Sequence, residues 1–600
     1  MSKLLHGIAF SDLPKKSNGL TNLQSYILQK ILPPEQNAET FLHGKLEDLP
    51  SPFLLPMMEE AVESMAKFIR EKKHILLYGD RDTDGVSSTS LLAIFLRKKH
   101  ESRGGQLTVQ TSSANDDYGL CEKAVSFIRS KKPDLLITLD FGSTNYDEIN
   151  TLAQEGMKVI VLDHHVVPER IPNCFLVNPK REDSEYPESK ICTSVIAMKL
   201  ILAYEIMRIV KKGLPPADKS PLGLKVNYQK LDLHSFFREN PTLLQIQKDL
   251  LDLSSIGTIT DMMPLQGENR IIVRNGLETL IRLNNETREE RKGLTNLITG
   301  LKLNSNKITS KDLGWSIGPV LNAAGRMGRT EVSLELLLET DSTKAGSCAQ
   351  KLIGINEERK ERTKRNIDRV DRYFLRKPER SSKKIIFCYE PDMEPGVSGI
   401  VATRLVQKYK KPTVFVTPDH GNARGSVRSY QKENVITLLT MLSDLFHHFG
   451  GHPEAGGFSI ELHRIPELEK RLPEVAEKWL SEAPREEEKL ESLVSFQGKE
   501  LNEKVFRELS LFEPFGQGNP QPTLSIKQAR ILSYRPMSGG IHGKFSILGV
   551  SSRIKGVIWN RGKEFEALLS LKAEIDLWGQ LEENYFNGST TIQFSVQDFV

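Results

Sequence analysis

Three short apolar segments, each ending in acidic or histidine residues, constrain the fold of this chain most. They are KKHILLYGD (72–80), PDLLITLDFG (133–142) and MKVIVLDHH (157–165). Stretches typical of helices separate them, such as STSLLAIFLRKK (88–99) and CEKAVSFIRSKK (121–132). Continuous apolar strands that alternate with helices indicate a parallel sheet covered on both faces. The sequence therefore predicts an α/β fold for its first half.

The acidic residues at the ends of these segments predict a site. In parallel sheets, ligands bind at the carboxyl ends of the strands. Asp80, Asp140 and Asp163 all fall at such ends. We therefore expect acids that lie far apart in the chain to converge in one crevice.

The rest of the chain divides into segments of different character, as expected for roughly three to five domains. Residues 190–300 read as mostly helical, and 356–377 form a charged stretch without Pro or Gly that predicts a long solvated helix. Strands KKIIFCYE (383–390) and KPTVFVTP (411–418) predict a second α/β unit. Short alternating runs over 523–600 predict an all-β module of OB-fold size.

Composition excludes several classes of protein. The net charge is +4, from 82 basic and 78 acidic residues, so the chain as a whole is no polycation. Its five cysteines are scattered without metal-ligand spacing, which favours a reducing compartment. No apolar run approaches the length of a membrane span. We expect a cytoplasmic, soluble monomer without membrane contact.

The stretch GDRDTDG (79–85) places three acids at alternate positions and has two simple interpretations. An Asp- and Gly-rich segment after a strand is commonly just a turn. It also matches the first half of an EF-hand loop, but Leu91 stands where the bidentate Glu would be needed.

Other ligand-type residues favour a metal site instead. The adjacent His164 and His165 end a buried-type strand, Asp140 ends another, and Asp261 follows an apolar stretch. Carboxylates with one or two imidazoles suit Mn²⁺ or Mg²⁺, and no cysteine accompanies them as structural zinc would require. Two cations about 3.5–4 Å apart can activate a water and clamp a phosphoryl group. The residues thus predict metal-assisted hydrolysis of a phosphoester.

The order of motifs resembles that of the DHH phosphoesterase superfamily. The matching segments are GDRDTDG, LDFGS, LDHH and GTITDMMPL, followed by GPVLNAAGRMG (318–328). GGHPEAGGFS (450–459) is similar to the glycine-rich motif of the accessory DHHA1 domain. ELSLFEPFGQGNPQP (508–522) resembles the start of the OB-type module of the RecJ exonucleases. The resemblance extends from about residue 40 to the C-terminus.

The resemblance implies roles for the acidic cluster. The implied catalytic residues are Asp82, Asp84, Asp140, His164, His165 and Asp261, and the implied metal ligands are Asp80, Asp82, Asp84, Asp140, His164 and Asp261. Asp140 is the candidate to bridge two ions. Asp80 and His165 are either ligands or residues that orient them, and Asp163 is expected to hold a histidine tautomer.

The resemblance also implies residues that bind substrate. Ser426 and Arg428 match the position that contacts a terminal phosphate, for which a hydroxyl and a guanidinium fork are suited. Gly450, Gly451 and His452 are expected to bring N–H groups and an imidazole to the strand, although a GGH segment can also be a plain turn. The remaining candidates are Asn322 and Arg326, for which helix capping and packing is the alternative.

In the last module, OB-type binding predicts basic and aromatic contacts with single strands. The candidates are His542, Lys544, Phe545, Trp559 and Tyr585, of which we expect only one or two to serve because aromatic residues in small β modules are usually core.

Three positions depart from the family pattern. Ser113 stands where the family has an Arg that helps bind a 5′ phosphate. Met393-Glu394 replaces Trp-His, and Phe141 replaces Asn after Asp140. None removes a metal ligand, but the first two put the preference for a 5′-phosphate end in doubt.

The combined prediction is an exonuclease that uses two Mn²⁺ or Mg²⁺ ions to degrade single-stranded DNA from the 5′ end in recombination and repair. A helicase and a single-strand-binding protein are the expected partners. The alternatives are a DHH phosphodiesterase for oligoribonucleotides or cyclic dinucleotides, and an inert single-strand-binding scaffold. The expected domains are an N-terminal extension (1–45), a DHH domain (46–350), a linker helix (351–380), a DHHA1 domain (381–465), and connecting helices with an OB-like domain (466–600).

Overall fold

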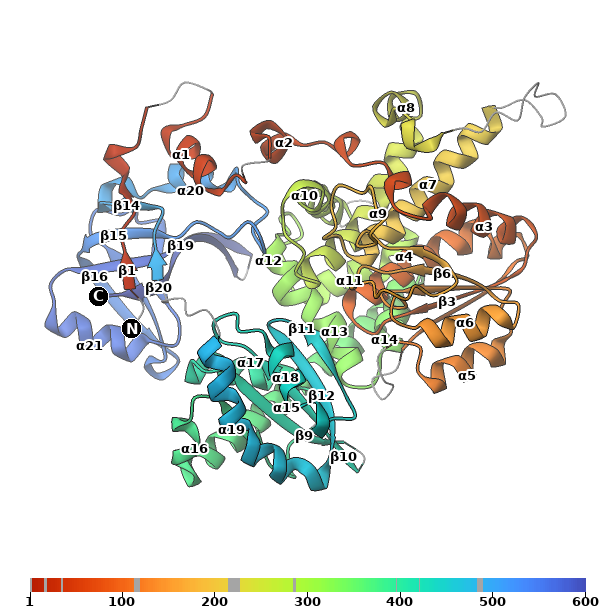
Figure 1. Cartoon of the computed structure of the whole chain (residues 1–600). Coiled ribbons are helices and arrows are strands. Elements are labelled where there is room, and N and C mark those ends of the chain that lie inside the picture. Colours follow the sequence, from red (N-terminus) through yellow and green to blue (C-terminus); the bar gives the residue numbers. More distant parts are fainter. Residues whose placement is uncertain are drawn as a thin grey trace. The chain divides into compact units, whose positions relative to one another are not determined.

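The computed structural model describes most of the 600 residues. The described ranges are 3–15, 19–33, 36–112, 119–213, 227–283, 288–394, 396–419, 421–482, 489–586 and 588–600. They form two compact units (Figure 1). The first comprises Met1–Asn322, Glu331–Gln350 and Lys489–Val600, and the second Ala323–Thr330 and Lys351–Glu488. Among the described helices, none combines the length and apolarity needed to cross a bilayer.

A five-stranded, fully parallel sheet organises the first unit and confirms the predicted α/β fold. Its order is β4-β3-β5-β6-β7. The strands are β3 (His74–Gly79), β4 (Gln106–Thr111), β5 (Leu135–Leu139), β6 (Lys158–Leu162) and β7 (Phe175–Val177). Every residue of β3 and β5 is buried, which explains why these strands read as unbroken apolar runs.

Helices cover both faces of this sheet. Alternate residues such as Leu76, Tyr78 and Leu136 pack with α5 (Glu122–Lys131) and α6 (Tyr146–Gln154). The helices α4 (Thr83–Lys99) and α7 (Thr193–Gly213) contact the sheet and each other. They also contact α9 (Pro241–Thr260), whose last turn leads to Asp261.

The region predicted to be helical is helical. Its further elements are α8 (Leu233–Glu239), α10 (Gly267–Arg282) and α11 (Lys292–Gly300). Beyond residue 300 follow α12 (Ser310–Asp312), a π-helical turn η7 (Leu313–Ile317), α13 (Gly318–Arg326) and α14 (Glu331–Leu338). The sequence also predicts a polar insert over 211–245, and its residues 214–226 lie outside the described part. Beyond that gap, Tyr228 stacks on Phe53 with ring centroids 4.9 Å apart.

An eight-stranded sheet, in the order β16-β17-β18-β20-β19-β15-β14-β2, forms the C-terminal module. Its C-terminal strands are β14 (Val494–Phe496), β15 (Leu524–Ala529), β16 (Ile531–Met537), β17 (His542–Ile547), β18 (Ile554–Ile558), β19 (Ile575–Phe586) and β20 (Ser589–Phe599). Two helices, α20 (Glu503–Ser510) and α21 (Gly562–Leu571), accompany it, so the module is not purely β.

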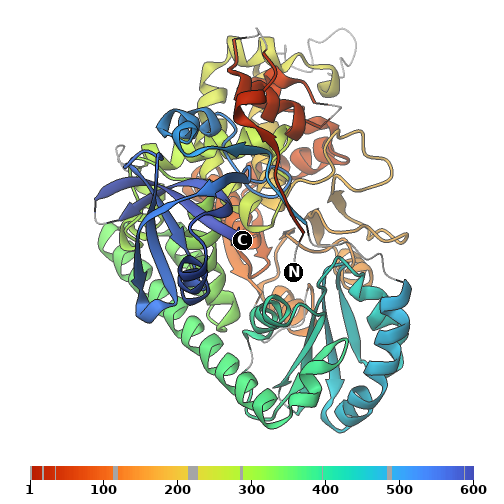
Figure 2. The same cartoon turned by 90° about the vertical axis from the view of Figure 1, so that its left-hand side faces the viewer.

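The N-terminal residues belong to the same core. The strand β1 (Lys3–Leu5) pairs with β13 (Lys489–Glu491), and β2 (Ile8–Ala9) pairs with β14. Leu23, Ile27 and Leu28 of α1 (Asn22–Ile31) are buried in the hydrophobic cluster of the C-terminal module. Figure 1 and Figure 2 show the red N-terminal segment against the blue C-terminal module. The N-terminal extension therefore folds as part of that module.

The second unit contains a mixed sheet and a long helix. The sheet order is β11-β12-β10-β9-β8, with β8 (Ile386–Tyr389), β9 (Thr413–Asp419), β10 (Asn422–Arg428), β11 (His448–His452) and β12 (Ala455–Glu461). The helix α15 (Ser342–Arg376) confirms the predicted long helix, and its residues Val370, Tyr373 and Phe374 pack into the unit. The helix α19 (Ile465–Glu482) also lies in this core, whereas 466 onward was expected to connect to the OB-like domain.

Candidate metal centre and strand-binding residues

The parallel strands deliver acids to one edge of the sheet. Asp80 and Asp140 directly follow β3 and β5, and their N–H groups extend the ladder to Leu139 O and Leu162 O, both at 3.0 Å. Asp163 follows β6 in the same way. Asp140 has φ +73°, a left-handed conformation that is strained for a residue other than glycine and concentrates at functional sites.

Two further acids lie at the start of α4. Asp82 caps this helix, because its Oδ1 accepts a hydrogen bond of 2.9 Å from Gly85 N–H. A Cβ at position 85 would come within 2.6–2.8 Å of the Asp80 backbone, so the turn requires glycine. Asp84 is 1% exposed and accepts from the N–H groups of Thr193 and Ser194, at 2.7 and 3.0 Å, at the start of α7.

The predicted ligands meet in three overlapping groups. Within each group, the candidate ligand atoms lie within 4.8 Å of one another. The groups are Asp80-Asp82-Asp140, Asp140-His164-His165 and Asp84-His164-Asp261. Asp140 and His164 each belong to two groups, as residues shared between neighbouring cation positions would.

The electrostatics of the cluster favour the binding of a cation. Burial, followed by the charges of neighbouring carboxylates, raises the pKa of Asp140 and of Asp261 well above the usual value. Burial and Asp82 raise the pKa of Asp80 to about 6. Asp261 also follows the last residue of α9, where the helix dipole is negative. A divalent cation would offset this repulsion.

His164 supplies the most direct indication of a metal. Its Nε2 lies 3.3 Å from Asp140 Oδ1 and 3.3 Å from Asp261 Oδ2. Within the described part of the chain, neither ring nitrogen of His164, nor Asp261 Oδ2, has a hydrogen-bond partner. Burial lowers the pKa of His164 to about 3, so the ring is neutral. A neutral imidazole that faces two carboxylates without hydrogen bonds fits a shared metal ion, and these oxygen and nitrogen donors suit Mn²⁺ or Mg²⁺.

Asp163 has a different position. Its Oδ1 accepts from the backbone N–H of His164 and His165, at 2.7 and 3.0 Å, and from His165 Nδ1 at 2.8 Å. Its Oδ2 accepts from Ser143 N–H at 2.9 Å. Burial acts to raise the pKa of Asp163, but the hydrogen bond and charge of His165 outweigh it and hold that pKa below its usual value. The carboxylate thus fixes Nδ1–H of His165 as a donor and leaves Nε2 as the ligand-type nitrogen.

Changing Asp163 to Asn should therefore lower kcat by about 10- to 100-fold with KM little changed, since the residue orients ligands. The amide would lack the charge that His165 needs and would turn an N–H₂ group toward Ser143 N–H. Steady-state kinetics of phosphoester hydrolysis, which give kcat and KM, measure the effect. Asp147→Asn, at an exposed position in the first turn of α6, is the matched control. An unchanged kcat for Asp163→Asn would contradict the orienting role.

Several residues around the cluster escaped the sequence analysis. Ser112, after β4, donates to Asp80 Oδ1 at 2.9 Å, and Thr193 Oγ1 donates to Asp140 Oδ1 at 3.0 Å. Lys180 is half-buried, and the charges of Asp261 and Asp163 act on it. The position of Ser112 at a strand end was the available signal for it, since β4 is the sheet neighbour of β3.

The two candidates in LNAAGR fall in different units. Asn322 is in the first unit, where its Oδ1 accepts from Thr83 N–H at 2.9 Å and so supports the start of α4. This is the capping role that stood as its alternative. Arg326 is exposed in the second unit, and its charge acts on Arg359 and Arg428.

The second unit aligns the other substrate-binding candidates in two rows. Ser426 pairs with Gly457 of β12, which pairs with Gly450, and Arg428 pairs with Ala455, which pairs with His452. Gly451 lies between them on β11 with φ +137°. The helix α17 (Ser398–Tyr409) begins beside this row, because Ser398 Oγ is 3.1 Å from Ser426 Oγ. The structure brings a hydroxyl, a guanidinium and a helix N-terminus together.

The charged neighbour of Arg428 is another cation, Arg326, and none of its described contacts is with an acid. It is half-buried and donates to the carbonyl oxygens of Val427 and Gly456. Burial, and then the nearby charge of Arg326, lowers the pKa of Arg428. Two guanidinium groups held near each other form a site suited to an anion.

The three departures from the family pattern have different surroundings. Ser113 lies outside the described residues. Phe141 is buried and packs edge-on against Tyr78, so it is a core residue. Glu394 forms ion pairs with Arg365 at 2.8 Å and Arg369 at 3.0 Å, which ties the loop after β8 to α15.

The OB-type candidates separate by exposure. Phe545 is 2% exposed in the core, which removes it as a stacking platform. Trp559 and Tyr585 are exposed, and His542 lies edge-on to Trp559 at 5.1 Å. Lys544 is exposed on β17.

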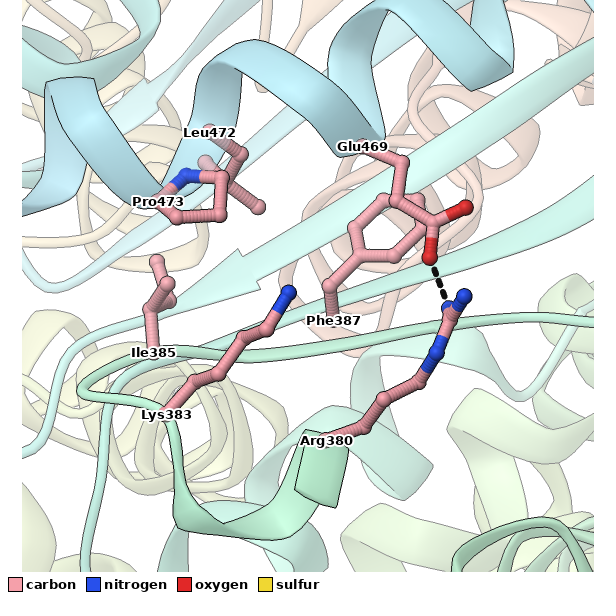
Figure 3. Close-up of a pocket in the computed structure, with 7 residues that line it drawn as sticks. All are labelled: Arg380, Lys383, Ile385, Phe387, Glu469, Leu472 and Pro473. Carbon is pink, nitrogen blue, oxygen red and sulfur yellow. Dashed lines mark hydrogen bonds and ion pairs between the residues drawn. The ribbon is translucent and has the colours of Figure 1, made fainter. Parts of the chain in front are cut away.

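One hollow of the second unit can be excluded as a ligand site. It lies between the start of β8 and α19, where Arg380 pairs with Glu469 (Figure 3). Its volume is 10 Å³, which is at most the room for one water.

Comparisons with known proteins agree with this architecture. Residues 74–220 match the N-terminal domain of the DHH family, residues 382–482 the DHHA1 domain and residues 494–598 the RecJ OB domain. The single-stranded-DNA-specific exonuclease RecJ of Bacillus subtilis is 29% identical over 575 residues, covering 94% of this chain and 66% of that protein. The RecJ exonuclease of Salmonella typhimurium is 27% identical and 90% of each chain is covered.

Solved structures give the same result. RecJ from Thermus thermophilus in complex with Mn²⁺ superposes with a TM-score of 0.76 at 25% identity, covering all of this chain and 80% of that one. A manganese-bound exonuclease RecJ gives a TM-score of 0.56 at 26% identity, over 73% of this chain and 98% of that one. The ordered domains and these matches agree: the chain carries DHH, DHHA1 and RecJ OB domains and is similar along most of its length to the RecJ exonucleases.

Proposed function

We propose that this chain hydrolyses phosphodiester bonds of single-stranded DNA from the 5′ end, with two divalent cations, Mn²⁺ or Mg²⁺, as cofactor. The observation that carries the proposal is His164, a neutral buried imidazole 3.3 Å from both Asp140 and Asp261 without a hydrogen bond. The relatives named as single-stranded-DNA-specific exonucleases support the choice of substrate. The matching manganese-bound RecJ structure supports the choice of metal.

The cluster offers ligands for two ions. Asp80, Asp82 and Asp140 would hold one, and Asp84, His164 and Asp261 the other; the third group, Asp140, His164 and His165, shares one residue with each of them. When bound, the cations supply Lewis-acid activation of a water and neutralise the charge of the phosphoryl group. The protein's own part is to hold these ligands rigidly, through the strand ends, the cap of α7 by Asp84 and the Asp163–His165 bond.

The second unit would hold the end of the strand. Ser426, Arg428 and the N-terminus of α17 together present a hydroxyl, a charged fork and a helix dipole, all of which favour a terminal phosphate. Arg326 adds positive charge nearby, and the GGH strand edge brings exposed N–H groups and His452 into the same rows.

A strand labelled at its 3′ end tests polarity and end recognition together. With Mn²⁺, we expect a ladder of progressively shorter labelled products. Arg428→Ala should raise KM for a 5′-phosphorylated strand by about 10-fold or more, because a charge-assisted hydrogen bond contributes about 1.5–3 kcal/mol. Its effect on a 5′-hydroxyl strand should be smaller.

Arg424→Ala provides the matched control for Arg428. Arg424 lies on the same strand, four residues away, and pairs with Asp419 at 2.5 Å. If Arg428→Ala and Arg424→Ala gave the same kinetics on both strands, the terminal-phosphate role would be wrong. Release of the label as the first product would instead show attack from the 3′ end.

The two alternatives predict other results in this assay. A phosphodiesterase for short oligoribonucleotides or cyclic dinucleotides would cleave a dinucleotide and leave a long strand intact. An inert scaffold would bind the strand without shortening it. The OB module, matched as a RecJ domain over 494–598, argues against the short phosphodiesterase, and the retained acids and both histidines of the cluster argue against the inert scaffold.

We infer that the enzyme acts in the cytoplasm, where unwound strands arise. A helicase would supply such strands and a single-strand-binding protein would cover them. The exposed Trp559 and Tyr585 of the OB module are the platforms that suit such a strand best.

A further inference from the structure

We propose that the groove beside the metal centre, within the first unit, binds one unpaired nucleobase of the strand, with Trp315 as its stacking platform. The inference deepens the proposed function and rests on it. Trp315 would stack on a base, whereas the residues proposed above contact phosphates.

The groove has the size and composition of a ligand site. Its volume is 670 Å³, within the range of about 300–1,000 Å³ that is typical of such sites. One wall comes from Ile259, Thr260, Met262 and Met263 and from residues between 307 and 322, and the other from residues between 506 and 521 and from 580–583 of the C-terminal module. Hydrogen bonds join the two walls: Leu265 N–H donates to Gln517 O at 2.7 Å, and Ser310 Oγ donates to Phe515 O at 2.6 Å.

Trp315 is an anomaly unless something covers it. Its side chain is 80% exposed, whereas its neighbours Leu313 and Ile317 in the same π-helical turn are fully buried. Met262, on the opposite side of Asp261 from α9, is 65% exposed and lines the same groove. Large exposed apolar side chains that line one groove mark interaction sites, and π-helical turns occur often at functional positions.

The platform is tied to the loops that carry metal ligands. Gly318, directly after the π turn, accepts through its O from Thr83 Oγ1 at 3.3 Å, and Thr83 lies between Asp82 and Asp84. A Cβ at Gly318 would come 2.3 Å from Thr260 Cγ2, and Thr260 precedes Asp261. A base on Trp315 would therefore be held in a fixed relation to the metal centre.

The chemistry of the opposite wall favours a base over a phosphate. Its acids are Glu513, Glu582 and Glu583, of which Glu582 and Glu583 are paired with Lys311 and Lys307 across the groove, the second pair at 2.5 Å (Figure 1 shows α12 beside β19). These pairs leave little net charge for a phosphate. Gln521 and Gln580 add amide groups to the lining, and amides beside an aromatic platform suit the edges and the face of a nucleobase.

Strands with a single abasic site, placed at successive positions from the 5′ end, test the inference through hydrolysis. In the unmodified enzyme, one position should slow cleavage by about 5- to 100-fold, the range that corresponds to loss of one stacked base. Trp315→Ala should cleave the intact strand that much more slowly and lose its sensitivity at that position. Trp315→Phe should keep most of both, and Leu571→Ala, equally exposed on α21, should behave as the unmodified enzyme.

A binding measurement gives a second readout that does not need hydrolysis. In a Trp559→Phe background, which removes the other exposed tryptophan of the first unit, oligothymidylate added in the absence of metal should quench tryptophan fluorescence, and Trp315→Ala in that background should lose most of that quenching. Cleavage with an unchanged abasic profile in Trp315→Ala would overturn the inference while leaving the proposed function intact. If no variant cleaved, the proposed function would fail, and the quenching alone would decide whether a base binds. Absence of quenching would overturn the subsite and leave an apolar protein segment as the occupant.

Discussion

Replacing Asp140 by Asn should reduce hydrolysis of single-stranded DNA by about 10³-fold, which corresponds to roughly 4 kcal/mol of transition-state stabilisation. Asp140 is shared by two of the three ligand groups, so its charge serves both candidate cation positions. Asn keeps the shape of the side chain and tolerates the left-handed backbone at φ +73°, which Ala would not. The loss would therefore report on charge and ligation rather than on the turn.

The same substitution should leave the metal-free protein as stable as before, or more stable. Burial and neighbouring carboxylates raise the pKa of Asp140, which means that its ionised form destabilises the metal-free fold. Circular dichroism and thermal unfolding without metal measure this. Asp147→Asn is the control, because it removes an exposed carboxylate from the same region. Full activity in well-folded Asp140→Asn protein would refute the metal assignment.

Much of the first sheet could be predicted because its signals are local. Each apolar run ends at an acid, and parallel pairing in register brings Gly79, Leu139 and Leu162 level, so the residues after them must be neighbours. The convergence of Asp80 and Asp140 follows from this geometry alone. Asp261 was a candidate from its own position after an apolar stretch, and the resemblance then supplied the distinction between His164 and His165.

Other features depend on partners far away in the chain. The N-terminal strands pair with residues almost 490 positions later, as Leu5 does with Glu491, and nothing in either short segment specifies the other. Asn322 supports Thr83 from 239 positions away. Alternation along the strands of the C-terminal module also does not tell which face is buried. The sequence therefore could not predict that Phe545 lies in the core while Trp559 is exposed. Tertiary packing decided these points.

Shared packing also bears on how the C-terminal module can be studied. Removing residues 500–600 would expose Leu23, Ile27 and Leu28, which are buried against that module. It would also remove Glu513, whose O accepts a hydrogen bond of 2.9 Å from Arg270. Arg270 donates to Phe41 O at 2.7 Å as well, so it links this module to the N-terminal segment. Single substitutions at exposed aromatic positions therefore test strand binding more cleanly than truncation.

Mn²⁺ should stabilise this protein strongly against unfolding. A ligand that binds only the folded state contributes about 2.7 kcal/mol at 100 times its Kd and about 4.1 kcal/mol at 1,000 times. Thermal unfolding with and without Mn²⁺ measures the gain in the first unit. Asp140→Asn should abolish most of the gain, whereas Asp147→Asn should retain it. An equal shift in all three proteins would place the binding site elsewhere.

The stability of the metal-free protein should also depend on pH in a definite direction. Burial and Asp82 raise the pKa of Asp80 to about 6 from 3.8. A raised carboxylate pKa gives stability that is complete below about pH 4 and is lost as the pH rises through about 6. The contribution of this cluster should thus make the metal-free protein unfold at a lower temperature at pH 7 than at pH 5. Cations bind the ionised carboxylates, so the difference in unfolding temperature between Mn²⁺-bound and metal-free protein should increase from pH 5 to pH 7. A difference that decreased over this interval would show that the acid cluster does not bind the metal.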